Sequence, residues 1–386
     1  MRLAALAFAL FPFTAHAECG GNFSTFIKGL KADAIARGHT PTQVDAFFKG
    51  AEQDPRVLKA DRAQGVFRKT FADFAKALIS QNRLSNGAAN AKKYKDTFNR
   101  IQREYGISRG VLLAFWALET DFGAVQGDFN TRNALVTLAH DCRRPDLFRP
   151  QVMAAVALYA RGDFDPARTQ GAWAGEIGQV QMLPLDILRN GVDGDGDGHI
   201  RLKTSSVDAL MSGAKMLSAL GWRQDEPWLQ EIRIPDTLDW TKTGLDTQLS
   251  TADWARQGIS ARNGSLAIGL KGSVLLPMGR KGPAFMVYPN FRVLFEWNKS
   301  FVYVTTAAYF AARLEGAPPF ARGKPDPALS ERDMKTLQKK LVARGHDVGK
   351  IDGILGANTR AAVQTEQSRL GLPADAWPTA ALLTKL

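Results

Sequence analysis

Two kinds of hydrophobic pattern divide the chain. From residue 22 to about 222, apolar residues recur three or four positions apart, as at Phe71 and Phe74, which is the spacing of amphipathic helices. From about residue 228 to 285, short apolar runs alternate with Gly, Asp and Pro, which favours short strands joined by turns. Helical spacing returns from 291 to 314. The pattern therefore predicts a mainly α fold: a helical domain that carries a small β-rich insertion.

A smaller unit follows at the C-terminus. Pro, Gly and Lys residues between 316 and 328 are typical of a linker. Residues 329–386 then show an apolar period of their own, which is enough for a three-helix module. No stretch reaches 18 uninterrupted apolar residues, so we expect no transmembrane segment.

The N-terminus has the pattern of an export signal. Met1 and Arg2 precede an almost wholly apolar run, and Ala15-His16-Ala17 supplies the small residues of a signal-peptidase site. The alternative is a buried N-terminal helix. We expect a signal peptide over residues 1–17, a catalytic domain over 18–315, and a soluble protein exported to the periplasm.

Charge and cysteine content agree with an exported protein that meets an anionic partner. The chain has 50 Lys and Arg against 38 Asp and Glu, a net charge of +12, which suits a nucleic acid, an acidic membrane or a carboxylate-bearing polymer. Export disfavours the nucleic acid. In an oxidising compartment Cys19 and Cys142 can form a disulfide, although two unpaired thiols are the alternative.

One acidic residue interrupts an apolar helix. Phe115, Trp116 and Phe122 lie at the positions −4, −3 and +3 from Glu119, so its carboxylate should face the core. Burial raises the pKa of a carboxyl towards neutrality, which lets a Glu deliver a proton to a leaving oxygen. Asp121 is about 200° around the helix and points elsewhere. A structural Glu in an ion pair is the alternative.

Four segments in order resemble the lytic murein transglycosylase B family. They are residues 119–123 (ETDFG), 172–184 (AWAGEIGQVQMLP), the Asp-Gly run from Asp193, and 297–303. The resemblance covers residues 22–315 and implies a lysozyme-like fold. It also implies that Glu119 is the sole acid and base. Glu119 would protonate the oxygen between N-acetylmuramic acid (MurNAc) and N-acetylglucosamine (GlcNAc), and then act as base while the muramyl C6 hydroxyl closes a 1,6-anhydro ring.

The same resemblance implies the substrate-binding residues. Gln181, Asn298 and Tyr303 match polar residues that the family places at the cleft, and Trp297 stands where relatives often have tyrosine and could stack on a sugar. Glu176 is a departure, because relatives typically carry Ala there. A hydrolytic glycosidase needs two carboxylates, whereas attack by the substrate's own hydroxyl can dispense with the second.

The segment from Asp193 has the pattern of a calcium loop. Asp193, Asp195 and Asp197 occupy positions 1, 3 and 5 of an EF-hand-like loop, and His199 at position 7 would coordinate through its backbone. Thr204 at position 12 cannot give the usual bidentate ligand. Relatives have a lengthened loop that ends in an acidic residue, which favours Asp208. We therefore expect a structural calcium ion and no cofactor for the chemistry.

The C-terminal module resembles the peptidoglycan-binding domain of cell-wall hydrolases over nearly all of residues 329–386. This resemblance implies attachment to the wall. The family often has an aromatic residue at the position of Glu366, so looser packing is expected there.

The sequence as a whole favours a periplasmic lytic transglycosylase that acts on peptidoglycan, with other cell-wall enzymes as partners. One alternative is a hydrolytic muramidase that uses Glu119 with Glu176 or Asp128 as a second carboxylate. The other is a non-catalytic wall-binding scaffold.

Overall fold

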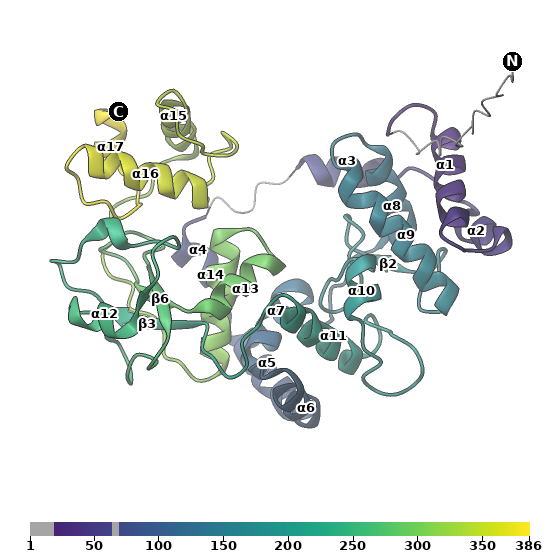
Figure 1. Cartoon of the computed structure of the whole chain (residues 1–386), viewed down its shortest axis with the longest axis horizontal. Coiled ribbons are helices and arrows are strands. Elements are labelled where there is room, and N and C mark those ends of the chain that lie inside the picture. Colours follow the sequence, from purple (N-terminus) through teal and green to yellow (C-terminus); the bar gives the residue numbers. More distant parts are fainter. Residues whose placement is uncertain (1–18, 64–68) are drawn as a thin grey trace, which may run out of the picture. The chain divides into compact units, whose positions relative to one another are not determined.

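The computed structural model describes residues 19–63 and 69–386, which form two compact units (Figure 1). The first unit contains residues up to 63, 127–177 and 182–189; the second contains 64–126, 178–181 and 190–386. The expected signal peptide over residues 1–17 lies outside the described part. Within that part, no helix combines the length and the hydrophobicity needed to cross a membrane.

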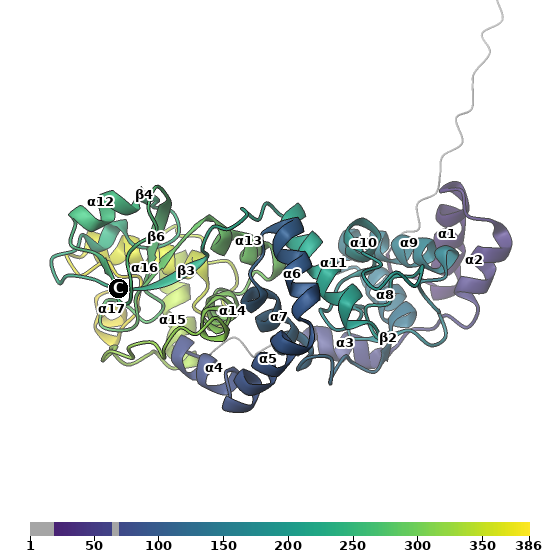
Figure 2. The same cartoon turned by 90° about the horizontal axis from the view of Figure 1, so that it is seen from below.

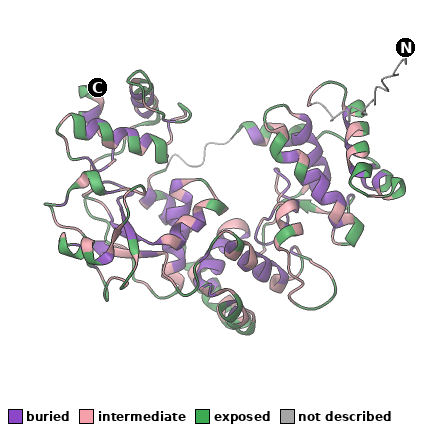
Figure 3. Cartoon of the chain, in the orientation of Figure 1, coloured by how far each residue is buried: buried purple, intermediate pink, exposed green. Residues whose placement is uncertain are grey.

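The first unit is helical. Its elements are α1 (Phe23–Ala36), α2 (Pro41–Phe48), α3 (Pro55–Arg62), β1 (Phe129–Asn130), α8 (Thr131–His140), α9 (Pro145–Arg161), β2 (Gln170–Gly171) and α10 (Pro184–Asn190). Side chains of Asn22, Thr40 and Asp54 accept backbone N–H bonds at the starts of α1, α2 and α3, as expected for N-caps. Helix α8 is buried along its whole length (Figure 3). Cys19 and Cys142 form a disulfide that links the segment before α1 to the loop between α8 and α9.

The second unit has a helical part around α7 and α14. Its helices are α4 (Phe71–Leu78), α5 (Gln81–Lys93), α6 (Lys95–Tyr105), α7 (Arg109–Thr120), α11 (Ser206–Ala219), α13 (Pro289–Trp297) and α14 (Phe301–Leu314). Helices α7 and α14 are largely apolar and pack against each other in the main core, and α6 runs beside α11 (Figure 2). The apolar sequence of α7 thus makes it a central helix.

The sequence between α11 and α13 forms the expected β-rich insertion. Its strands are β3 (Leu229–Arg233), β4 (Leu249–Ser250), β5 (Ser260–Ala261), β6 (Lys271–Leu275) and β7 (Phe285–Val287), with α12 (Thr251–Arg256) after β4 and a 3₁₀ turn at Trp240–Lys242. The order is β4-β6-β7-β3-β5, and all neighbours are antiparallel. Trp254 of α12 is fully buried in a core on this sheet.

Three further helices end the chain: α15 (Glu331–Val342), α16 (Ala357–Arg369) and α17 (Ala380–Lys385). They enclose a separate small core around Leu337, Leu341 and Val363. The predicted mainly α architecture, with a small sheet and a C-terminal helical module, is therefore confirmed. The domain boundaries proposed from sequence, including the linker at 316–328, stay predictions.

Candidate active site and calcium loop

Glu119 lies at the C-terminal end of α7, half-buried beside α13 and α14. Its Oε1 accepts a hydrogen bond from the hydroxyl of Tyr303 and a second from Nε1 of Trp297, at 3.3 Å. Both donors are neutral, and both come from helices that pack on α7. Because Oε1 is held by two donors, the carboxyl proton of a general acid at this position belongs on Oε2.

Tyr303 is held as a hydrogen-bond donor. It is 8% exposed. Burial, the charge of Glu119 and the hydrogen bond to Glu119 raise the pKa of Tyr303 well above 10, while the positive charge of Arg83 lowers it. The phenol therefore stays protonated at any physiological pH and can donate to the carboxylate throughout a reaction.

Asp121, the second acidic residue of the motif, faces a different partner. It ends α7 in the left-handed conformation with φ of 50°, and its carboxylate accepts a bond from Nε of Arg83 at 3.0 Å. Arg83, on α5, also donates to the carbonyl of Leu78. Sequence spacing does not single out this arginine, because a basic residue on an amphipathic helix is usually solvated.

Thr120 connects α7 to the loop at 178–181, which contains Gln179 and Gln181. Its hydroxyl donates to the carbonyl of Gln179 at 2.6 Å and accepts the N–H of Gly123 at 2.9 Å. Gly123 has φ of +89°, and a Cβ there would lie 2.8 Å from the side-chain oxygen of Gln179. Thr120 and Gly123 of the ETDFG motif therefore position the loop at 178–181 against α7, a role that their spacing alone does not indicate.

The structure places the predicted substrate-binding residues in two segments. Gln181 is a non-glycine residue with φ of 52°, and its Nε2 donates to the carbonyl oxygens of Gly178 and Gln126 at 2.8 and 3.4 Å. Such a backbone conformation is uncommon outside glycine and often marks functional loops. Asn298 follows α13, and its Oδ1 accepts the N–H of Ser300 at 2.9 Å.

Trp297 already stacks on another aromatic ring of the protein. Its ring stacks on Phe115 of α7 with a centroid distance of 4.5 Å and an interplanar angle of 22°. One face of the indole is thus covered by protein, and its N–H is directed at Glu119. Stacking of Trp297 on a sugar stays a prediction for the other face.

Glu176 and Asp128, the candidates for a second carboxylate, belong to the first unit. Asp128 is exposed. The carboxyl of Glu176 is buried, and its Oε2 has no hydrogen-bond partner among the described residues. Burial raises the pKa of Glu176, although two backbone N–H groups and the charge of Arg144 lower it in part. The raised pKa means that ionisation of this buried carboxyl is disfavoured relative to an exposed Glu.

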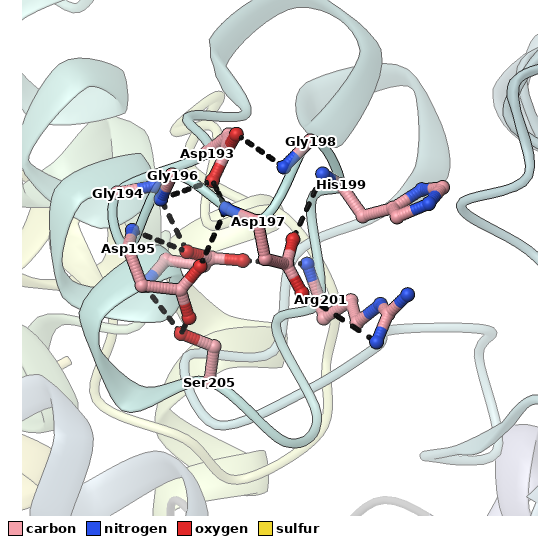
Figure 4. Close-up of polar contacts among 10 residues, drawn as sticks. Asp193, Gly194, Asp195, Gly196, Asp197, Gly198, His199, Arg201 and Ser205 are labelled. Carbon is pink, nitrogen blue, oxygen red and sulfur yellow. Dashed lines mark hydrogen bonds and ion pairs between the residues drawn. The ribbon is translucent and has the colours of Figure 1, made fainter.

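Asp193, Asp195 and Asp197 bring three carboxylates together in one loop (Figure 4). One oxygen from each lies within 4.8 Å of the others. Desolvation raises the pKa of Asp193, but the N–H groups of Gly198, Gly196 and Asp197 lower it more, so the net effect keeps this carboxylate ionised. Converging carboxylate oxygens are the donor set that calcium prefers, so these residues fit the ion.

Asp208 fixes the ends of this loop. It is fully buried at the start of α11. Its Oδ1 accepts the N–H groups of Gly194 and Asp195 at 2.9 and 3.3 Å, and its Oδ2 accepts that of Arg201 at 2.7 Å. Backbone anchoring is therefore its visible role, and calcium coordination by Asp208 and His199 stays a prediction.

Family comparisons cover most of the chain. A model described as transglycosylase SLT domain matches residues 22–312, and one described as peptidoglycan binding domain matches residues 330–386. The membrane-bound lytic murein transglycosylase B of Escherichia coli (strain K12) is 27% identical over 229 residues, which are 59% of this chain and 62% of that protein. The match thus spans less than two thirds of this curated relative.

Solved structures match more completely. SltB3 from Pseudomonas aeruginosa, in complex with NAG-anhNAM-pentapeptide, has a TM-score of 0.86 at 33% identity and covers 95% of this chain and 99% of its own. The Escherichia coli lytic transglycosylase SLT35 in complex with calcium has a TM-score of 0.66 at 23% identity, with 80% of this chain and 98% of that chain covered. At 23% identity, the similarity to SLT35 shows a shared fold alone.

Proposed function

Because the chain belongs to the family of proteins with a transglycosylase SLT domain, we propose that it is a lytic transglycosylase of peptidoglycan. It cleaves the β-1,4 bond between MurNAc and GlcNAc without water and leaves 1,6-anhydro-MurNAc ends. The observation that carries this proposal is the environment of Glu119, whose Oε1 is held by the neutral donors Tyr303 and Trp297, whereas the neighbouring carboxylate of Asp121 is paired with Arg83.

Glu119 supplies the proton in the first step. With Oε1 accepting from two donors, the proton carried on Oε2 passes to the glycosidic oxygen as the bond from C1 of MurNAc to that oxygen breaks. The sugar passes through a state resembling an oxocarbenium ion. The carboxylate that remains is stabilised by Tyr303 and Trp297, because hydrogen bonds to the charged form favour it.

The same carboxylate completes the reaction. It removes the proton of the muramyl C6 hydroxyl while O6 bonds to C1, which closes the 1,6-anhydro ring and returns Glu119 to its acid form. Nucleophile and electrophile belong to one sugar, so the step gains from proximity and consumes no water. One carboxyl therefore suffices for both proton transfers.

The loop around Gln181 and the segment Trp297–Asn298 bind the glycan in this proposal. The strained backbone of Gln181 supports its role. The calcium loop supplies stability only: a bound ion would neutralise three clustered carboxylates and fix the chain between Gln181 and α11. The two proton transfers proposed for Glu119 use no cofactor.

Export to the periplasm and attachment to the wall complete the proposal. The signal-like residues 1–17 and the Cys19–Cys142 disulfide suit an oxidising compartment. The module at residues 330–386 matches a peptidoglycan binding domain, and other cell-wall enzymes are candidate partners. The chemical identity of the newly formed glycan end tests the whole proposal.

A further inference from the structure

The C-terminal module is held against the sheet insertion and α14 by buried contacts. Arg360 of α16 donates to the carbonyl of Pro277 at 2.6 Å and lies over the ring of Phe301, with 4.3 Å between its guanidinium carbon and the ring centroid. Burial lowers the pKa of Arg360 to about 9, so it keeps its charge at neutral pH. Gln364 donates to the carbonyls of Trp240 and Thr243, both at 2.9 Å.

Apolar contacts extend the same attachment. Trp377 of the module is 4% exposed and belongs to the main core that contains Phe301 and Tyr303. Leu355 packs against this core and also against the module's own core. The loop of the module at 354–356 is therefore held in a defined position beside the start of α14.

A groove with a volume of about 210 Å³ lies between this loop and α14. It is lined by Lys299, Ser300, Phe301, Val302, Ile354, Leu355 and Gly356. Four of these residues fill the interval in the chain between Asn298 and Tyr303, and Tyr303 donates to Glu119. The groove thus adjoins the segment that holds the candidate catalytic carboxylate.

The lining suits a peptide better than a sugar ring. Phe301 is the one aromatic residue in it and is 7% exposed, so it offers little surface for stacking. The walls are aliphatic, and Lys299 at the rim has a side chain that is 72% exposed and paired with Glu296 at 2.6 Å. The module carries nine Lys and Arg against six Asp and Glu over residues 329–386. Small apolar side chains and free carboxylates complement such a groove.

We propose that this groove binds the peptide that peptidoglycan carries on MurNAc, so that the module helps to select peptide-bearing strands at the catalytic site. The inference rests on the proposed function. The module would then act as one wall of the substrate site, in addition to any attachment to the wall polymer elsewhere on its surface.

Steady-state cleavage of two soluble glycan substrates tests the proposal. One substrate carries its peptides, and the other has had them removed by an amidase. Ile354→Asp places a negative charge in the groove, and Lys299→Ala removes the cation at its rim. We expect each variant to raise KM for peptide-bearing strands at least fivefold more than KM for peptide-free strands, with kcat nearly constant. Ile351→Asp is the matched control, because Ile351 is 41% exposed on the same loop and lies outside the groove.

The outcomes separate the two proposals. If the groove variants change both substrates equally, or neither, peptide binding in the groove is refuted while the lytic activity stands. If the unaltered protein cleaves neither substrate, the proposed function itself fails. Melting temperatures of Ile354→Asp and Ile351→Asp show whether a loss reflects unfolding, and Lys299→Ala, at an exposed side chain, keeps the test valid if Ile354→Asp unfolds.

Discussion

The phenol of Tyr303 donates its hydrogen bond to the same carboxylate oxygen of Glu119 that accepts the indole N–H of Trp297. Both donors lie on the α13–α14 segment, whereas Glu119 lies in the last turn of α7. The packing of these helices thus directs both donors to one oxygen of the Glu119 carboxylate.

Tyr303→Phe should shift the pH dependence of cleavage. Removing a donor to a charged group costs about 1.5–3 kcal/mol, so the pKa of Glu119 should rise in the variant. The alkaline limb of the profile of kcat/KM against pH should therefore move up by about one to two pH units. Trp297→Phe should cause a smaller shift in the same direction, because its donor is farther away.

Tyr309→Phe is the matched control for this shift. Tyr309 lies on the same helix and is similarly buried, but its hydroxyl accepts bonds from Arg313 and Phe320. Identical pH profiles for Tyr303→Phe and Tyr309→Phe would show that the contact with Glu119 has no electrostatic role.

Glu176→Gln should change stability and leave the reaction products as they are. Burial raises the pKa of Glu176 in the folded state, so folding is progressively opposed as the pH rises from the unfolded value, about 4.3, towards the folded one. The difference in melting temperature between the variant and the unaltered protein should therefore be more positive at pH 8 than at pH 5. Asp128→Asn, at an exposed position, should show no such dependence. Loss of cleavage in Glu176→Gln would instead favour the hydrolytic alternative with two carboxylates.

Calcium should raise the melting temperature through the loop at Asp193–Asp197. A ligand that binds only the folded state at 100 times its Kd contributes about 2.7 kcal/mol. Asp195→Asn keeps an oxygen acceptor but removes one charge, and should abolish the increment between chelator and millimolar calcium in differential scanning fluorimetry. Magnesium should give a smaller increment, because it dehydrates reluctantly. If calcium did not change the melting temperature of the unaltered protein, the proposed calcium site would be refuted.

Glu366 should stabilise the module above acidic pH. Hydrogen bonds from Arg369 lower its pKa first, burial opposes this, and His346 lowers it further. The stabilisation is therefore present above the ordinary Glu value of about 4.3 and is lost as the pH falls through the lower folded value.

Glu366→Gln should consequently lose about 1–3 kcal/mol at pH 7. The difference from the unaltered protein should shrink below pH 4 in urea unfolding experiments. Glu331→Gln, in an exposed i,i+4 pair with Lys335, should lose less than about 0.5 kcal/mol. Equal losses of unfolding free energy in the two variants would show that Glu366 stabilises the module no more than an exposed ion pair does.

Periodicity was enough to predict the helical body, the sheet insertion and the C-terminal helices, because each depends on local spacing of apolar residues. It also indicated that α7 is a core helix with an acid on it. Looser packing at Glu366 stays a prediction: the residue is 3% exposed, and its carboxylate is hydrogen-bonded to Arg369 and His346. Side-chain pairing of this kind depends on rotamers that sequence spacing does not specify.

Contacts over long sequence separations explain most of what the sequence could not predict. Arg83 meets Asp121 across 38 residues, and Thr120 meets Gln179 across 59. The indole of Trp297 reaches Glu119 across 178 residues. Each pairing follows from how helices pack, which no local pattern determines. The attachment of the module through Arg360 and Gln364 was missed for the same reason, since a Pro-rich segment precedes it and suggested a free linker.

Mass spectrometry of the glycan ends released from purified peptidoglycan distinguishes the lytic reaction from hydrolysis. We predict muropeptides that end in 1,6-anhydro-MurNAc, which are 18 Da lighter than their hydrolysed counterparts by the mass of one water. Glu119→Gln should release none, while still sedimenting with intact wall material. Reducing MurNAc ends that incorporate ¹⁸O from labelled water would show that the enzyme is a hydrolase. Undiminished release by Glu119→Gln would show that Glu119 is not the catalytic acid.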